Sequence, residues 1–285
     1  MDKLPLVSIV VPSYNHELYI KRCIESVISQ TYAEIQLIVI DDGSTDRSRE
    51  ILTDLSARYN FIFLTQNNKG LSKTLNDGIR NFATGKYISV LASDDYWCPE
   101  KIELQVQYLE NNNSYAMVFG KSYIVNEMDV VTGILGEGVT SSDLGFDRLL
   151  FDNKVIASTV LLRKNIWNEV GGFNEDSYIE DWDLWLKVAN RYKIGFINKC
   201  LGFYRRHDFN MSNNLLKMEN AKGAIIEQWR DHPLYEKSYK HHILQKASVL
   251  ATKFKTESLK LLWNHSSYMF NQTYIKALVK LLIYW

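Results

Sequence analysis

Apolar runs and amphipathic stretches alternate along the first hundred residues of this chain. Residues 6–11 form a compact apolar run that we expect Pro12 to end, and residues 18–28 place apolar side chains at helical spacing. The alternation continues through strand-like residues 35–40, helical residues 46–59, strand-like residues 61–64, helical residues 71–82 and strand-like residues 86–92. Strands that alternate with helices at short spacing predict βαβ units with parallel strands. This part of the chain therefore predicts a doubly wound α/β sheet.

The middle and the end of the chain have other patterns. Residues 115–163 contain short strand-like pieces around a Gly-rich stretch, residues 133–145, which predicts turns and a loop. A mixed sheet is expected here, because helical pieces between the strands are missing. Residues 164–192 are helical in pattern, and after Tyr204 the sequence becomes amphipathic and helical. The expected division is an α/β domain at 1–208 and a C-terminal helical region at 209–285.

Composition narrows the classes of partner and compartment. The 285 residues include 33 basic and 33 acidic side chains, so no overall charge favours nucleic acid as a partner. The three cysteines, at positions 23, 98 and 200, lack zinc or redox spacing and fit a reducing compartment. No apolar stretch approaches the ~20 residues that cross a bilayer. We expect a cytoplasmic protein, or one peripheral to the inner face of the cytoplasmic membrane.

The most informative motif is the pair Asp94 and Asp95, directly after the apolar run 86–92. Its position predicts two carboxylates at the carboxyl edge of the sheet, where open α/β sheets bind ligands. Adjacent carboxylates repel each other unless a cation or hydrogen-bond donors offset the charge, and oxygen ligands favour Mg²⁺ or Mn²⁺ over zinc. The alternative is that both acids only cap the helix that follows.

Two earlier loops carry polar side chains to the same predicted edge. After the first strand, Tyr14 could stack on a base and Asn15 could offer an amide donor and acceptor, although an ordinary turn also uses such residues. After the second strand, Gly43 permits a tight turn and Asp42 leaves a carboxylate that could accept from a base or a ribose. The rest of that loop, through Asp46, can cap the next helix.

Two further segments are weaker indications. Lys69 and Lys73 flank the start of a helix, where free N–H groups attract phosphate. Downstream, Gly171 and Gly172 allow close approach to the backbone, and the acids Glu180 and Asp181 open a helix rich in tryptophan. Acids in a first helical turn are also favoured by the helix dipole alone, and the tryptophans could simply be core.

Taken together, the ordered motifs resemble the family 2 glycosyltransferases with the GT-A fold. The resemblance covers about residues 5–208 and rests on the motifs at residues 12–15, 41–46, 93–95, 171–173 and 180–181. It implies a GT-A-like, doubly wound, mostly parallel mixed sheet, with the C-terminal helices as an appendage. It does not specify the sugar.

The resemblance also implies roles for single residues. Tyr14 would stack on the nucleotide base, Asp42 would hydrogen-bond the uracil ring, Asp94 would contact the ribose, Asp95 would bind the metal, and Asp181 would be the general base. Pro12, Asn15 and Lys73 complete the expected nucleotide site, Glu180 accompanies Asp181, and His207 is a second expected metal ligand. Arg205 and Arg206 could pair with phosphate or lie in solvent. Leu75 stands where many members of the family carry an arginine.

The implied reaction is inverting transfer of a sugar from a nucleoside-diphosphate sugar, expected to be UDP-linked, to an acceptor hydroxyl. Mn²⁺ or Mg²⁺ would assist the leaving diphosphate, and the expected acceptor is a lipid-linked glycan of bacterial surface polysaccharide synthesis. No protein nucleophile is needed. Two alternatives stay open: a sugar nucleotidyltransferase, against which the first loop argues because it lacks a Gly-rich basic signature, and a non-catalytic binder of nucleotide sugars.

The C-terminal segment 274–285 is apolar with Lys276 and Lys280 four residues apart. Such a helix could lie in a lipid interface. It could equally dock on the catalytic domain or on another subunit, and amphipathicity alone does not separate these readings.

Overall fold

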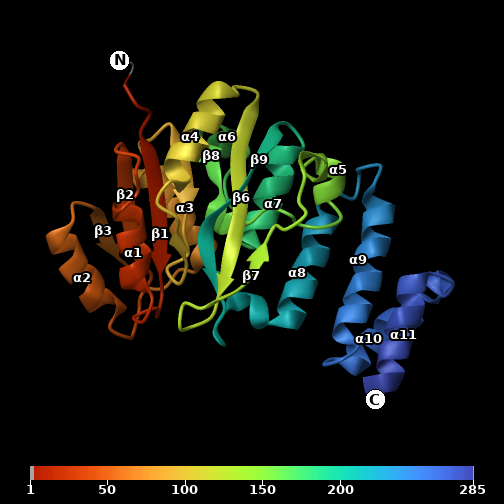
Figure 1. Ribbon diagram of the computed structural model, residues 1–285. Coiled ribbons are helices and arrows are strands. Elements are labelled where there is room, and N and C mark those ends of the chain that lie inside the picture. The colour runs from red at the N-terminus through yellow and green to blue at the C-terminus, as the bar shows by residue number, and fades with distance from the viewer. Residues whose placement is uncertain (1–2, 285) are drawn as a thin grey trace. The chain divides into compact units, whose positions relative to one another are not determined.

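The computed structural model describes residues 3–284 (Figure 1). Its contacts divide the chain into two compact units. The sheet unit comprises Met1–Leu149, Lys154–Glu175 and Glu180–His207, and the helical unit comprises Leu150–Asn153, Asp176–Ile179 and Asp208–Trp285. The two-part division expected from the sequence, at residue 208, stays a prediction.

The sheet unit is built on one mixed sheet with strand order β3-β2-β1-β4-β8-β6-β9-β5, and β7 pairs with β6. The strands are β1 (Val7–Ser13), β2 (Ile35–Asp41), β3 (Ile62–Thr65), β4 (Tyr87–Val90), β5 (Tyr96–Trp97), β6 (Tyr115–Val125), β7 (Val131–Leu135), β8 (Leu161–Arg163) and β9 (Lys193–Arg205). β3, β2, β1 and β4 are parallel, and β6 is parallel to β9. β8 runs antiparallel between β4 and β6. The expected mostly parallel mixed sheet is confirmed.

Helices cover both faces of the parallel part, as alternating side chains of β1 show. Val7, Ile9 and Val11 enter the core cluster that includes α1 (Ile20–Ile28), whose buried residues recur at helical spacing. On the other face, α3 (Leu71–Phe82) packs so closely that a Cβ added at Gly78 would lie 2.8 Å from a Val10 methyl group. A strand buried on both faces explains the continuous apolar run in the sequence.

Of the remaining helices of the sheet unit, one belongs to the predicted alternation, and two lie in the stretch 164–192, which was predicted to be helical. They are α2 (Ser48–Arg58), α4 (Lys101–Asn111), α5 (Phe146–Leu149), α6 (Lys164–Glu169) and α7 (Glu180–Ala189). Four helices dominate the helical unit: α8 (Leu215–Glu227), α9 (Tyr235–Leu250), α10 (Lys255–Asn264) and α11 (Gln272–Tyr284). α9 contacts α8, α10 and α11. Within residues 3–284, none of the helices combines the length and the apolar character needed to cross a membrane.

Two local expectations were wrong. β1 does not end at Pro12 but continues to Ser13. Like Val10, two residues earlier, Pro12 directs its backbone groups toward β4, but the pairing of β1 with β4 has already ended at Val10. The missing N–H therefore leaves no ladder partner unsatisfied. The Gly-rich stretch is not all loop either, because its first residues belong to β7, which pairs antiparallel with β6.

Candidate functional site

The carboxyl ends of β1, β2 and β4 lie at one edge of the sheet, because these strands are parallel neighbours. Ser13 and Asp41 end β1 and β2 in register, and the acidic doublet begins three residues after Leu91, just beyond the end of β4. The backbone N–H of Leu91 still donates to Val10, which holds the start of the segment after β4 against β1. The topology thus brings Tyr14, Asp42 and the acidic doublet to a common edge.

Arg205 organises the acidic doublet from the end of β9. Its backbone N–H donates to a carboxylate oxygen of Asp95 at 2.9 Å, and its Nε donates to the carbonyl oxygen of Asp94 at 2.9 Å. The guanidinium is buried, ion-pairs with Asp129 and lies 4.6 Å from the ring centroid of Tyr19. Arg205 is therefore neither solvated surface nor free for phosphate; it fixes the backbone that carries both acids.

The two acids have different environments although they are neighbours. Burial, followed by the charge of Asp94, raises the pKa of Asp95 well above its ordinary value. For Asp94, burial acts in the same direction, but the hydrogen bond with His207 and the nearby His16 outweigh it and lower the pKa. The negative charge of the doublet is thus concentrated on Asp94.

Asp94 belongs to a cluster with His16 and His207, whose ligand atoms all lie within 4.8 Å of one another. His207 Nε2 lies 3.0 Å from Asp94 Oδ2, and His16 Nδ1 lies 2.7 Å from the Ser93 hydroxyl. In the described part of the chain, this is the group of side chains with metal-ligand spacing. Two imidazoles and one carboxylate suit Mn²⁺ better than Mg²⁺, which prefers oxygen ligands.

The cluster contains His16 and Asp94, whereas the sequence motifs indicated Asp95 and His207 as the metal ligands. His16 directly follows the turn residues after β1, so its position at the carboxyl edge was the available signal. Asp95, the ligand implied by the resemblance, is not part of the cluster and accepts from the backbone of Arg205. His207, the other expected ligand, is part of it.

The two early loops are tied to each other and to the start of α3. Asn15 has a positive φ of 55°, and its side-chain oxygen accepts from the N–H of Thr45 at 2.8 Å. The carboxylate of Asp42 accepts from the backbone N–H groups of Lys69 and Gly70, at 2.8 and 2.9 Å. Asn15 and Asp42 thus order the loops, whereas the side chain of Tyr14 is 46% exposed.

Of the two remaining residues predicted to bind the nucleotide, one is buried and one is exposed. Pro12 is buried within β1, whereas Lys73 is exposed on the first turn of α3. Leu75 is buried in the core, so this position offers no polar contact. Lys69 forms an ion pair with Asp77 at 3.0 Å.

The downstream acids open α7 in the sheet unit, the same compact unit that holds the acidic doublet. Glu180 and Asp181 are its first two residues, and the carboxylate of Asp181 accepts from the N–H of Trp182 at 2.6 Å. Trp182 is buried, and its indole N–H donates to the carbonyl of Leu149 at 2.8 Å. The tryptophans of α7 are therefore core residues. Glu180 and Asp181 are the ionisable side chains at the first two positions of the helix.

A loop before α7 is held against α3 by one side chain. The amide group of Asn76 donates to the carbonyl of Phe173 at 2.9 Å and accepts from its N–H at 3.0 Å. Gly172 has a φ of 76°, and a Cβ there would lie 2.7 Å from the ring of Trp167. Gly172 is thus needed for this close packing, whereas Gly171 has open space beside it and only its φ of 91° favours glycine.

Comparisons with known proteins agree with this geometry. Residues 8–153 match the family model described as glycosyl transferase family 2. An uncharacterized glycosyltransferase of Haemophilus influenzae is 33% identical over 237 residues, which cover 79% of this chain and 72% of that protein. The chain belongs to glycosyl transferase family 2. It is thus a glycosyltransferase with a GT-A fold, as the sequence motifs led us to expect.

Proteins whose names state an activity are also similar to this chain. The UDP-Glc:alpha-D-GlcNAc-diphosphoundecaprenol beta-1,3-glucosyltransferase WfgD of Escherichia coli is 30% identical, with 80% of this chain and 88% of WfgD covered. Solved structures share the fold. S. aureus TarS 1–349 in complex with UDP-GlcNAc has a TM-score of 0.65 at 20% identity, covering 96% of this chain and 79% of TarS. The mannosyltransferase PcManGT of Pyrobaculum calidifontis, in complex with GDP-Man and Mn2+, has a TM-score of 0.65 at 14% identity, covering 99% of this chain and 88% of PcManGT.

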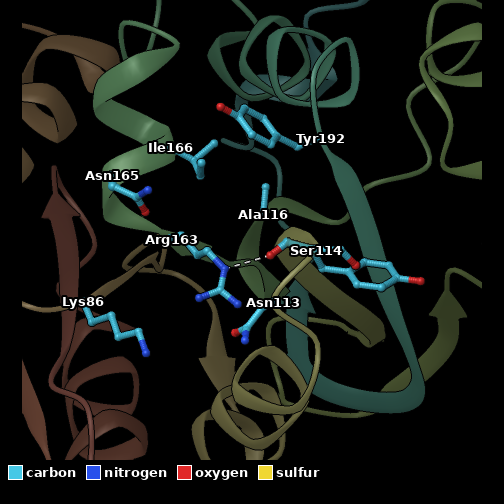
Figure 2. A pocket seen from close by; sticks show the side chains of 9 residues that line it. Lys86, Asn113, Ser114, Ala116, Arg163, Asn165, Ile166 and Tyr192 are labelled. Carbon is cyan, nitrogen blue, oxygen red and sulfur yellow. Dashed lines mark hydrogen bonds between the residues drawn. The ribbon is translucent and has the colours of Figure 1, made fainter.

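This glycosyltransferase also has a cavity of about 360 Å³ (Figure 2). The cavity lies at the ends of the strands that are opposite to the acidic doublet. Lys86 immediately precedes β4, and Tyr115 begins β6, whereas the acidic doublet follows β4. Arg163 in this cavity donates to the carbonyl groups of Tyr115 and Leu109, at 2.8 and 2.7 Å. Its guanidinium therefore joins secondary structure elements, and none of the predicted site residues lines this cavity.

The Glu180 carboxyl group should make the free energy of unfolding depend on pH. Burial, followed by the charge of Asp181, raises its pKa from 4.5 to about 8. Between these values the folded state binds more protons than the unfolded state, so this group lowers the free energy of unfolding as the pH rises. The variant Glu180→Gln should lose that contribution and be more stable than the parent above pH 8. Thermal unfolding at several pH values tests this, and identical pH profiles for both proteins would refute it.

Proposed function

We propose that this chain is a metal-dependent, inverting glycosyltransferase that uses a nucleoside-diphosphate sugar, UDP-linked, and a lipid-linked glycan acceptor. The observation that carries the proposal is the cluster of Asp94, His16 and His207 at the carboxyl edge of the sheet, next to the exposed Tyr14. WfgD, by its name, transfers glucose from UDP-Glc to a GlcNAc on diphosphoundecaprenol. That name supports the UDP donor and a lipid-linked acceptor, such as occurs in bacterial surface polysaccharide synthesis.

Asp94 and the two histidines would hold a divalent ion, with Mn²⁺ favoured by the two imidazole nitrogens. When bound, such an ion offsets the negative charge that develops on a departing diphosphate. Tyr14 would bind the base through its exposed ring, while Asp42 and Asn15 hold the loops that shape the base pocket. In this proposal Arg205 is a positioning residue, because it holds the backbone of the acidic doublet.

The acceptor hydroxyl must lose a proton as it attacks the anomeric carbon from the face opposite the leaving group. Asp181 would accept that proton. Glu180, with its raised pKa, would carry its own proton at neutral pH, which places one negative charge rather than two at the start of α7. Attack by the acceptor itself requires no protein nucleophile and inverts the anomeric centre.

A panel of nucleotide sugars, supplied with Mn²⁺ and a glycosyl diphosphate-lipid acceptor, tests the proposal. We expect release of the nucleoside diphosphate from one UDP-sugar and a product with inverted anomeric configuration by NMR. Release of pyrophosphate from UTP would instead indicate a nucleotidyltransferase. Binding of a nucleotide sugar without any turnover would indicate a non-catalytic binder.

Tyr14→Ala is expected to weaken the binding of UDP, because the stacking of a base on an aromatic ring contributes roughly 1–3 kcal/mol. Calorimetry should show a dissociation constant about 5- to 150-fold higher than in the parent. Tyr14→Phe is the matched control, since it keeps the ring and should bind UDP as the parent does. If Tyr14→Ala binds UDP with unchanged affinity, the ring has no role in base recognition.

A further inference from the structure

The helical unit exposes an unusual concentration of large apolar side chains. Trp263 on α10 is 80% exposed, and Phe270 in the α10–α11 connection is 90% exposed. The exposed set within residues 259–283 consists of Leu259, Trp263, Met269, Phe270, Ile275, Leu278, Val279, Leu282 and Ile283. Scattered exposed apolar residues are normal, but a concentration of this kind marks an interaction surface.

Helix α11 has two apolar faces. Tyr274, Ala277 and Leu281 are buried in the core that α11 shares with α9 and α10. At 100° per residue, the exposed apolar residues form a second, separate arc of roughly 140°. That arc consists of Ile275, Leu278, Val279, Leu282 and Ile283. Packing within the helical unit therefore does not account for this second face.

The charge of the same segment indicates what covers it. Residues 258–285 contain Lys260, Lys276 and Lys280 and no aspartate or glutamate, although the whole chain has a formal net charge of zero. Lys260 and Lys276 are exposed, and on the helical wheel Lys276 lies beside the exposed apolar arc. Lysines at the border of an apolar face can extend their ammonium groups to anionic headgroups while their stems cover apolar surface.

We propose that the exposed side chains of α10, the α10–α11 connection and α11 bind to the surface of a membrane that contains anionic phospholipids. A tryptophan, a phenylalanine and aliphatic side chains would insert at the headgroup level, and the lysines would face the negative charge. A second copy of this chain is a poorer occupant, because two surfaces with the same excess of positive charge repel each other. The inference rests on the helical unit alone and does not depend on the proposed sugar transfer.

Vesicle sedimentation of the full chain, without nucleotide or acceptor, tests this surface. We expect binding to phosphatidylcholine vesicles that contain phosphatidylglycerol, weaker binding at high salt, and little binding to phosphatidylcholine alone. The triple variant Trp263→Gln, Leu282→Gln, Ile283→Gln should partition at least about tenfold less, because it removes apolar area that would be buried in lipid. The control Met128→Gln, Val130→Gln removes exposed apolar side chains from the sheet unit and should bind as the parent does.

The charge contribution is tested separately with Lys260→Gln, Lys276→Gln. Each lysine near an anionic surface contributes about a fivefold effect, so this variant should lose most of the preference for phosphatidylglycerol. Equal binding by the triple variant, its control and the parent would overturn the proposal. So would a failure of the parent to bind vesicles, whether it stays monomeric in analytical ultracentrifugation or forms a dimer that the triple variant dissociates. In every case, turnover of a nucleotide sugar remains an independent measurement.

Discussion

Asp181→Asn is expected to lower kcat about 100- to 10,000-fold, because it removes the group proposed to take the proton from the acceptor hydroxyl. The carboxamide keeps the size and the acceptor oxygen that meets the N–H of Trp182, so the start of α7 should stay intact. The dissociation constant for the donor should be unchanged, since Asp181 is proposed to act only on the acceptor. Single-turnover kinetics and calorimetry of donor binding measure the two quantities.

The matched control for this variant is Asp54→Asn, which neutralises an exposed acid on α2 of the same unit. It should retain the kcat of the parent. Turnover in Asp181→Asn at the rate of the parent would eliminate Asp181 as the base. A loss of donor binding in that variant would mean that the acid serves the donor instead.

Asp94→Asn is expected to weaken the binding of Mn²⁺ at least about 100-fold. Loss of a residue that only hydrogen-bonds a metal ligand typically costs about 10- to 100-fold in metal affinity, and loss of a charged ligand itself should cost more. Asp95→Asn should weaken it less, because the Asp95 carboxylate accepts from the backbone N–H of Arg205 and lies outside the cluster. Titration of Mn²⁺ into each variant in the presence of UDP measures the difference. This pair of variants distinguishes the geometry of the structure from the assignment that the family resemblance implies.

The reverse order of effects would contradict the cluster assignment. If Asp95→Asn abolishes binding while Asp94→Asn binds as the parent does, Asp95 is the metal ligand and Asp94 is left for the ribose. His16→Gln offers an independent test, because only the cluster assignment gives this histidine a role.

The fold of the N-terminal part follows from local patterns, and that explains why the sequence was sufficient there. The apolar run of β1 is buried on both faces, and the helical spacing of Ile20, Cys23, Ile24 and Val27 matches one buried face of α1. Polar residues at the ends of parallel strands must meet at one edge. The location of the site was therefore predictable, including the acidic doublet and the loop that carries Tyr14.

The partners of each side chain were not predictable, because they depend on strand pairing between distant segments. β9 lies beside β6 and ends on the acidic doublet, and only this pairing reveals that Arg205 supports Asp94 and Asp95. In the same way, the sequence does not show that the carboxylate of Asp42 is used by the N–H groups of the loop before α3. Nor does it show that His16 and His207, far apart along the chain, meet at Asp94.

Asp94 and two histidines at the sheet edge are proposed to bind a divalent ion beside a nucleoside diphosphate. Pulsed electron paramagnetic resonance of Mn²⁺ with the full chain and UDP tests this proposal most directly, because coupling to ¹⁴N reports imidazole ligands. We expect protein-bound Mn²⁺ with ¹⁴N coupling in the parent. The coupling should be reduced in His16→Gln and in His207→Gln. Bound Mn²⁺ without nitrogen coupling, or Mn²⁺ that stays free in the presence of UDP, would contradict the proposal.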